Sequence, residues 1–345
     1  MSDLRQRVGR NSYAGMEPVG AAGRSPQPPT RTAEEDGIKM AKRTSVGLIT
    51  PSHRGDLDRF VMMIESMDRH VQHRGRHYVI VHDEDVALFA PYGSADRLIL
   101  PASNFLPRSL AQIPFVRWRG RRYWWRFGSK PISGWHAQQI VKIQAASMLP
   151  EERYCLVDSD NVFFRDFDLA QIAAPNPIPL RVHPLAVAEN RPRHVKWIGS
   201  AHRLLGIDAP ILPTDDFIDQ IIVWDQATIR AMIERIFHTT RLHWAAALCK
   251  EHEFSEYMIY GSFVTHNLAE LRRHSRTTKS FCCAHWDDDR LDQADILKML
   301  VAAPLHEVAL CVQSFGETPV SAIKASLRAF HRQESGAVRL MTVAE

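Results

Sequence analysis

The chain has few cysteines, no long apolar run and no apolar segment at its start. Its 345 residues include five cysteines, odd in number and without a CxxC spacing. This pattern favours reduced thiols over a disulfide framework or a zinc site. No stretch approaches the ~18 consecutive apolar residues of a membrane helix. The N-terminus also lacks the apolar region of a secretory signal. We therefore expect a cytoplasmic protein whose membrane contact is at most peripheral.

Four common catalytic motifs are missing from the sequence. It contains neither the P-loop GxxxxGK[ST] nor the dinucleotide-binding turn GxGxxG. GxSxG and HExxH are absent as well. These absences argue against the commonest nucleotide hydrolases, dehydrogenases, serine hydrolases and metalloproteases.

The chain also lacks a strong charge of one sign. Its formal net charge is +4, but residues 1–43 carry eight Lys/Arg and five Asp/Glu, which leaves +1 for residues 44–345. A nearly neutral body argues against nucleic acid as a partner. The first 43 residues are rich in Gly, Pro, Ser, Arg and Glu without apolar periodicity, so we predict a disordered tail. Met40, just before the first strand, is a candidate for the true start.

Beyond residue 43, apolar strands alternate with amphipathic helices. The pattern predicts strands at 45–50, 77–82, 97–100, 154–157, 217–224 and 308–312, and helices at 57–71, 135–148, 225–237, 287–301 and 318–330. Continuous apolar strands between helices are typical of a mostly parallel sheet covered by helices. We therefore expect one α/β domain over 44–345. Two stretches without a regular pattern, about 101–134 and 165–215, are predicted to be insertions.

Two acidic residues follow the apolar strand at 154–157. Asp158 and Asp160 point the same way if the strand continues, because strand side chains repeat every two residues. Paired carboxylates at a strand end are costly to desolvate without a cation, and Mg²⁺ or Mn²⁺ commonly binds one or two carboxylates together with phosphate oxygens. The alternative is a solvated acidic turn.

Three further residues could line the same cleft. Gln138 and Lys142 are spaced i, i+4 on the helix that leads into the acidic strand, so Lys142 could neutralise a phosphate. His285 follows an apolar strand-like segment and could complete a metal site. The alternatives are a solvated helix face and a structural or surface histidine.

Two other segments contain residues that could take part in catalysis or ligand binding. Glu256 lies among aromatic residues, which could raise its pKa and suit it to acid–base work, although a half-buried structural carboxylate would look the same. The segment 117–126 holds five arginines among four aromatic residues. It could form a lid over a diphosphate, bind single-stranded nucleic acid, or be a plain surface loop. The neutral body favours the lid.

Taken in order, these elements resemble the GT-A class of nucleotide-sugar glycosyltransferases. The run Leu156–Phe163 looks like the acidic metal strand of that class. The preceding helix, with Trp135, Gln138 and Lys142, is similar to one in bacterial GT-A-like proteins known mainly by a domain-of-unknown-function label. The other similar positions are the strand-end segment Thr50-Pro51-Ser52, Asp83, the segment 254–261 that contains Glu256, and His285.

The resemblance, which covers about residues 45–290, implies a GT-A-like, Rossmann-like fold and a function. The protein would move a sugar from a nucleoside-diphosphate sugar, most simply a UDP-sugar, to an unknown glycan or lipid-linked acceptor. Asp158, Asp160 and His285 would bind Mn²⁺ or Mg²⁺, and Glu256 would be catalytic. The donor site would consist of Thr50, Pro51, Ser52, Asp83, Gln138, Lys142 and Asp158.

Other classes of function fit the same residues. A nucleotidyl- or phosphoryl-transferring enzyme could use the same metal pair. A non-catalytic protein could keep the fold and bind only a nucleotide or RNA. Turnover of a nucleotide sugar would distinguish an enzyme from a protein that only binds, and a steep salt dependence of RNA affinity would indicate RNA binding.

Overall fold

A computed structural model describes residues 46–118, 121–251 and 253–342, with side chains described except at 114–118, 121–122 and 336–342. The predicted tail and the candidate start at Met40 lie outside the described residues. Across this range, no helix is both long and apolar enough to cross a membrane.

A five-stranded, mostly parallel sheet forms the centre of the fold, which confirms the predicted α/β class. Its strand order is β14-β8-β1-β3-β4, with only β14 antiparallel to its neighbour. These strands are β1 (Val46–Pro51), β3 (His77–Val81), β4 (Arg97–Pro101), β8 (Arg153–Val157) and β14 (Ile221–Asp225). The carboxyl ends of the four parallel strands therefore share one edge.

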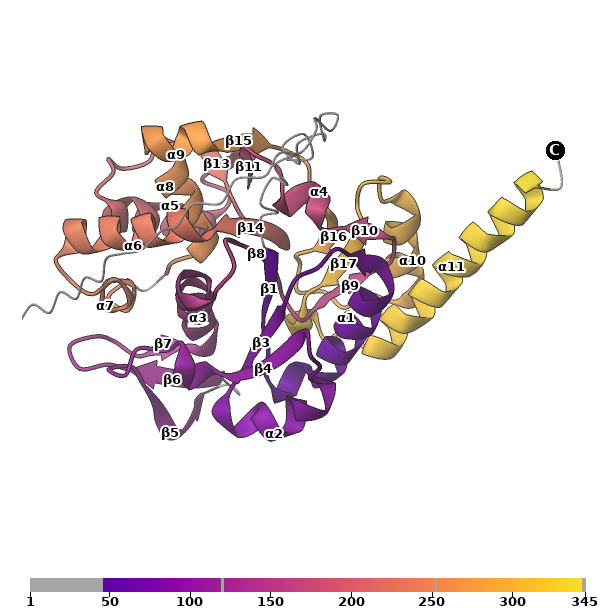
Figure 1. Ribbon diagram of the computed structural model, residues 1–345, viewed down its shortest axis with the longest axis horizontal. Coiled ribbons are helices and arrows are strands. Elements are labelled where there is room, and N and C mark those ends of the chain that lie inside the picture. Colours follow the sequence, from indigo (N-terminus) through magenta and orange to yellow (C-terminus); the bar gives the residue numbers. More distant parts are fainter. Residues whose placement is uncertain (1–45, 119–120, 252, 343–345) are drawn as a thin grey trace, which may run out of the picture. The chain divides into compact units, whose positions relative to one another are not determined.

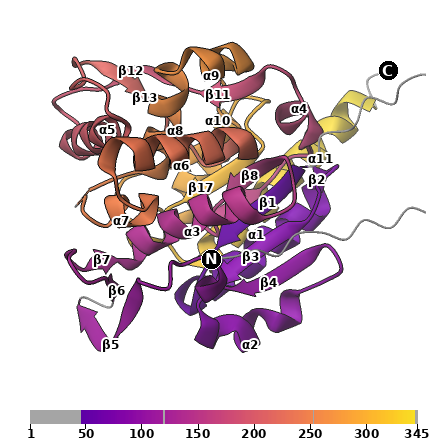
Figure 2. The same ribbon diagram turned by 60° about the vertical axis from the view of Figure 1, so that its left-hand side comes forward.

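Alternating side chains of this sheet bury two separate cores. One face packs against α3 (Gly134–Met148), α6 (Gln226–Thr240) and α8 (Glu256–Thr265) through residues such as Ile49, Ile80, Leu156 and Trp224. The other face packs against α1 (Leu57–His70) through residues such as Leu48, Val81, Cys155 and Val223. Figure 1 shows α1 and α3 on opposite sides of β1 and β8, and Figure 2 shows α6 running beside α3.

A second sheet continues directly from the acidic pair. It has three strands in the order β16-β17-β9, namely β9 (Asn161–Phe163), β16 (Cys282–His285) and β17 (Ala309–Val312). The strands β16 and β17 are parallel, and β9 is antiparallel to β17. Helices α10 (Gln293–Ala302) and α11 (Val320–Thr342) pack here in a third apolar core.

Both predicted insertions contain more regular structure than their sequences suggest. The first holds an antiparallel sheet of β5 (Ala111–Trp118), β6 (Arg121–Trp125) and β7 (Ile132–Ser133). The second holds β10 (Phe167–Asp168), α4 (Ala170–Ala173), β11 (Ile178–Arg181), β12 (His183–Val187), α5 (Pro192–Leu205) and β13 (Thr214–Asp216).

Helix α5 shows how the second stretch can be regular although its sequence predicts no regular pattern. Its proline, Pro192, stands in the first turn, where a missing N–H costs nothing. Its end is set by Gly206, whose φ of 63° is easy for glycine. Proline therefore starts this helix rather than breaking it. The remaining short elements are β2 (Val71–Gln72), α2 (Val86–Phe89), α7 (Trp244–Leu248), α9 (Leu268–Arg273), β15 (His274–Thr277) and five 3-10 turns.

Candidate functional site

A directed chain of hydrogen bonds links the carboxyl ends of β8 and β1 to the first residues of β3 and β4. The Thr50 hydroxyl donates to the carbonyl of Val157 at 2.7 Å, and His77 Nε2 lies 2.9 Å from that hydroxyl. Arg97 Nε donates to His77 Nδ1 at 3.2 Å, so His77 carries its proton on Nε2 and donates to Thr50. Burial, reinforced by Arg97 and Arg74, lowers the pKa of His77 to about 3. The chain is therefore neutral at His77 and fixes the backbone just before Asp158.

Thr50 itself is fully buried, with its hydroxyl used inside the sheet. Its side chain is thus a support for the site and is not available to touch a ligand. Of the predicted strand-end segment, Pro51 and Ser52 reach the surface of the hollow described below.

The acidic pair lies where β8 ends. The Asp158 side chain is 35% exposed and forms an ion pair with Lys142. Asp160 is partly buried, and its Oδ1 atom is buried with no hydrogen-bond partner among the described residues. Burial, together with Asp158 and Asp56, raises the pKa of Asp160 to about 7. An unpaired carboxylate oxygen held at a strand end is suited to a hard cation.

Lys142 joins three of the predicted residues into one cluster. Its Nζ lies 2.8 Å from Asp158 Oδ1 and 3.1 Å from both Asp158 Oδ2 and Glu256 Oε1, and it also donates to the hydroxyl of Tyr257 at 3.2 Å. These three partner residues match its three protons, and its side chain is only 6% exposed. Lys142 is therefore engaged by the protein and is not free for the phosphate contact that its helical spacing predicts.

Glu256 lies at the first position of α8, which brings it to α3 across 114 residues of sequence. Its backbone N–H donates to Gln139 Oε1 at 3.1 Å, so α3 also fixes the start of α8. Burial raises the pKa of Glu256, Lys142 opposes this effect, and Asp158 reinforces it. Burial alone would lower the pKa of Lys142, but Asp158, Tyr257 and Glu256 together raise it well above its ordinary value. The cluster is thus an ion pair network in which the ammonium stays charged.

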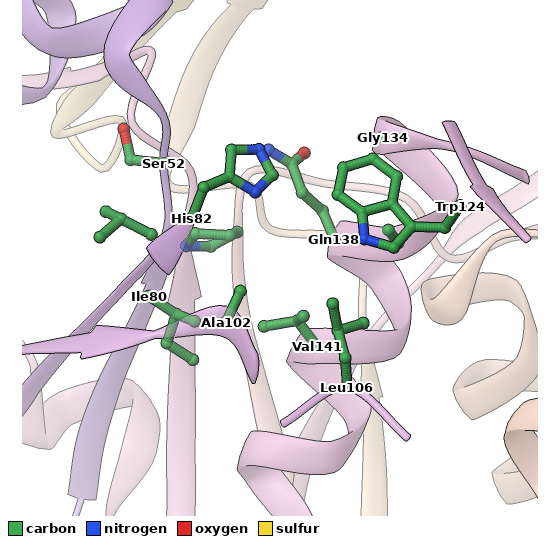
Figure 3. A pocket seen from close by; sticks show the side chains of 12 residues that line it. Ser52, Ile80, His82, Ala102, Leu106, Trp124, Gly134, Gln138 and Val141 are labelled. Carbon is green, nitrogen blue, oxygen red and sulfur yellow. The ribbon is translucent and has the colours of Figure 1, made fainter. Parts of the chain in front are cut away.

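A small hollow opens beside this cluster at the carboxyl ends of β1 and β3. Figure 3 shows Ser52, His82, Gln138 and Trp124 along one side of it, and Ile80, Ala102, Leu106 and Val141 along the other. The His82 and Trp124 rings stack, with centroids 5.4 Å apart and an interplanar angle of 23°. The buried hydroxyl of Ser52 has no hydrogen-bond partner in the described part of the chain. The hollow is small, but its mostly apolar lining with a few polar groups is typical of small-molecule sites.

In the loop after β3, the buried acid is not the one predicted from the sequence. Asp83 is exposed and accepts a hydrogen bond from the backbone N–H of Ser103 at 3.1 Å. The buried acid is Asp85, which accepts from Arg54 Nε at 2.6 Å and from the Arg54 backbone N–H at 3.0 Å. This pair ties the loop after β1 to the loop after β3. The residue of this loop that lines the hollow is His82, not Asp83.

His285 lies at the same end of the second sheet as Asp160. It is opposite Val312 on β17, and Asn161 is opposite Cys311 on the other side of β17. Two strand spacings, about 10 Å, therefore separate the backbones of β16 and β9. Among the described residues, His285 lies instead near two other acids, Asp287 and Asp289. The ligand atoms of these three residues lie within 4.8 Å of one another, and this group does not include the Asp158/Asp160 pair.

The Arg-rich segment 117–126 belongs to the hairpin of β5 and β6. Residues 119–120 and the side chains of Arg117, Arg121 and Arg122 lie outside the described residues. Trp124 is buried in the hollow, whereas Trp125 is 44% exposed. The described part of the hairpin thus contributes a ring to the candidate site, and the predicted lid motion stays a prediction.

Together, the fold and these side chains define an α/β protein with a candidate ligand site at the carboxyl edge of a mostly parallel sheet. A family model described as a family of unknown function, DUF6492, matches residues 43–335. The match covers most of the chain, so the chain belongs to this family. No curated protein matches the chain.

Proposed function

We propose that this protein is a metal-dependent glycosyltransferase of the GT-A type that uses a nucleoside-diphosphate sugar, with UDP as the expected nucleotide. One observation carries the proposal: the acidic pair and the aromatic hollow share one edge of the sheet. The hollow lies at the ends of β1 and β3, and Asp158 and Asp160 follow β8, the neighbour of β1. Ligands of open α/β sheets usually bind at this edge.

The residues present fit a hard divalent cation. The unpaired Oδ1 of Asp160 and the carboxylate of Asp158, which is 35% exposed, are oxygen donors of the kind that Mn²⁺ and Mg²⁺ prefer. Bound there, such an ion would supply positive charge to the departing diphosphate. His285 would have to reach this site from across β17, or else serve the separate group with Asp287 and Asp289.

The protein's own residues would perform the remaining tasks. Ser52, His82 and Trp124 would orient the base, and Gln138 would hydrogen-bond the nucleoside. Lys142 would keep Asp158 and Glu256 in place through its ion pairs. Glu256, with its raised pKa, would orient the acceptor hydroxyl or take its proton. The acceptor would be a glycan or a lipid-linked sugar.

Calorimetry with UDP, in the presence of Mn²⁺ and in the presence of EDTA, tests the donor site. We expect tight binding only with the metal. Release of UDP from a panel of UDP-sugars, compared between the unmodified protein and Glu256→Gln, then tests transfer. A general acid or base is worth about 10²–10⁴-fold in rate, so the variant should lose turnover far more than donor affinity.

Two matched carboxylate variants locate the metal. Asp160→Asn should abolish the metal dependence of UDP binding, whereas Asp289→Asn should leave it intact. The reverse result would place the metal at His285, Asp287 and Asp289. Equal UDP affinity with Mn²⁺ and with EDTA would contradict the proposal.

A further inference from the structure

Two tryptophans form a partly open aromatic surface between α3 and α5. Trp135, in the first turn of α3, stacks on Trp197 of α5 with ring centroids 5.4 Å apart and an interplanar angle of 29°. Trp197 is 6% exposed, and Trp135 is 39% exposed. The buried ring therefore fixes the orientation of the outer one, which keeps a large part of its surface in contact with solvent.

A cation lies over both rings. The Arg193 guanidinium is 5.2 Å from the centroid of Trp135 and 4.9 Å from that of Trp197. Its side chain is 63% exposed, and Glu253 approaches it only to 4.0 Å. Two indole rings thus hold a guanidinium that retains donors for an anion, since arginine stacks on aromatic faces and still binds carboxylate or phosphate in its plane.

The aromatic surface contains a polar group without a partner. Trp197 Nε1 is buried, and the described residues offer it no acceptor. A buried N–H without an acceptor is uncommon in folded proteins and is usually satisfied by an ordered water or a bound group.

The position of this surface relates it to the candidate active site. Trp135 precedes Gln138 by one helical turn and Lys142 by two turns, which is about 10 Å along α3. The same turns of α3 contact the start of α8, through His136 against Phe254 and Gln139 to Glu256. The surface therefore lies along α3 from the Lys142 cluster, on the side where α8 begins.

We propose that Trp135, Trp197 and Arg193 bind a sugar ring that carries a carboxylate or a phosphate, and that this ring belongs to the acceptor. The apolar face of the ring would lie on Trp135, which Trp197 holds in place, and the anionic group would pair with Arg193. Naming this ligand the acceptor rests on the proposed function; the binding of an acidic sugar does not.

The test is an NMR titration of the full chain with glucuronic acid, glucose 6-phosphate, glucose and UMP, without nucleotide sugar or metal. We expect both acidic sugars to bind at least about tenfold more tightly than glucose, because charge-assisted bonds to arginine are the stronger ones. Preference for glucuronic acid or for glucose 6-phosphate then distinguishes the two anions. If the indole signals of Trp135 and Trp197 respond to UMP at lower concentrations than to either acidic sugar, the proposal is overturned, since the surface would then be a nucleotide site; UMP binding that moves only signals of the hollow does not bear on it.

Three variants connect the binding to these residues. Trp135→Ala should weaken both acidic sugars about tenfold through the lost ring contact. Arg193→Gln should bring their affinity down to that of glucose. Phe237→Ala, which removes another exposed aromatic side chain (48% exposed) on α6, should change nothing and serves as the control. Unchanged binding by Trp135→Ala, with its fold verified by circular dichroism, would refute the inference.

The result for acidic sugars can be distinguished from the result for UDP binding at the donor site. If UDP fails to bind in the presence of Mn²⁺ but acidic sugars bind at Trp135, the proposed function fails and this binding site stands. If UDP binds and acidic sugars do not, only this inference is wrong.

Discussion

Replacing Lys142 by methionine should destabilise the protein because it leaves the buried carboxylate of Glu256 without a counter-charge. Lys142 and Glu256 are 6% and 3% exposed, so neither charge is well solvated by water. Removing one partner of a buried ion pair typically costs about 3–5 kcal/mol. Asp158, which is 35% exposed, should contribute little to this loss because solvent can screen it. We therefore expect Lys142→Met to lower the free energy of unfolding by about 3–5 kcal/mol near neutral pH.

The loss should depend on pH in a defined direction. The pKa of Glu256 is already raised in the folded protein, and Lys142 holds it down. Without Lys142 this pKa rises further, so the folded variant binds a proton that the unfolded chain has released. Such a group stabilises the folded state less as pH rises through the interval between its unfolded and folded pKa values. The cost of Lys142→Met should consequently be smaller at about pH 5 than at about pH 8.

Urea unfolding of four proteins measures this effect: the unmodified chain, Lys142→Met, Glu256→Gln and the double variant. The double variant should recover at least about 1–2 kcal/mol relative to the sum of the single losses, because it leaves no buried charge on Glu256. Lys324→Met is the matched control, since Lys324 is 39% exposed and lies 3.8 Å from Glu65. Its loss should stay below about 1 kcal/mol. Additive single losses, or a Lys142→Met loss no larger than that of the control, would refute the buried ion pair.

Three further outcomes follow from the site. Without metal, Asp160→Asn should be more stable than the unmodified protein at about pH 8 and equal to it at about pH 4, because the raised pKa of Asp160 costs stability as pH rises toward about 7. Asp288→Asn, at an exposed acid, should show no such gain at about pH 8 in urea unfolding. His82→Ala should weaken UDP binding about 2- to 13-fold in calorimetry, because the proposed base site would lose a ring that Trp124 holds in place, while Mn²⁺ affinity stays unchanged. His77→Gln should reduce the loss of stability as pH falls from about 6.5 to about 3 in the same unfolding assay, because the folded protein keeps His77 neutral while the unfolded chain takes up a proton there. An unchanged dependence of stability on pH would mean that the hydrogen bonds through Thr50 do not hold His77 neutral.

Most of the central sheet was predictable because its strands and helices have clean periodicities. The strands β1, β3, β4 and β8 and the helices α1 and α3 lie close to the predicted ranges. The insertions were not predictable in the same way. In β5 and β6 the arginines hide the alternation, and in α5 the proline stands at the one place where a helix tolerates it.

The candidate site was predictable to the extent that it depends on strand ends. The position of Asp158 and Asp160 after an apolar strand placed them at the sheet edge before any tertiary contact was known. The pairing of Lys142 with Glu256 could not be predicted, because it depends on how α8 packs against α3. Trp124 lies in the segment 117–126 that was predicted as a lid, but its stacking on His82 in the hollow could not be predicted, because it depends on how the hairpin packs.

His82 could have been found from the sequence. Tyr78, Ile80 and His82 alternate along β3, and the first two face the core that contains α3. The next residue of that series must point to the same side, whereas Asp83 must point away. Applying the alternation one residue past the strand would have favoured His82 for the hollow, where it lies.

The charges of the site support separate roles for its carboxylates. Lys142 supplies one positive charge, and it is shared by Asp158 and Glu256. Asp160 does not share it, since its Oδ1 atom has no partner among the described residues and its pKa rises to about 7. A carboxylate retained at a strand end in this state costs stability that the fold itself does not recover. A bound cation would offset that cost, so in the proposed enzyme Asp160 would be the principal metal ligand and Asp158 would link the metal to the Lys142 cluster.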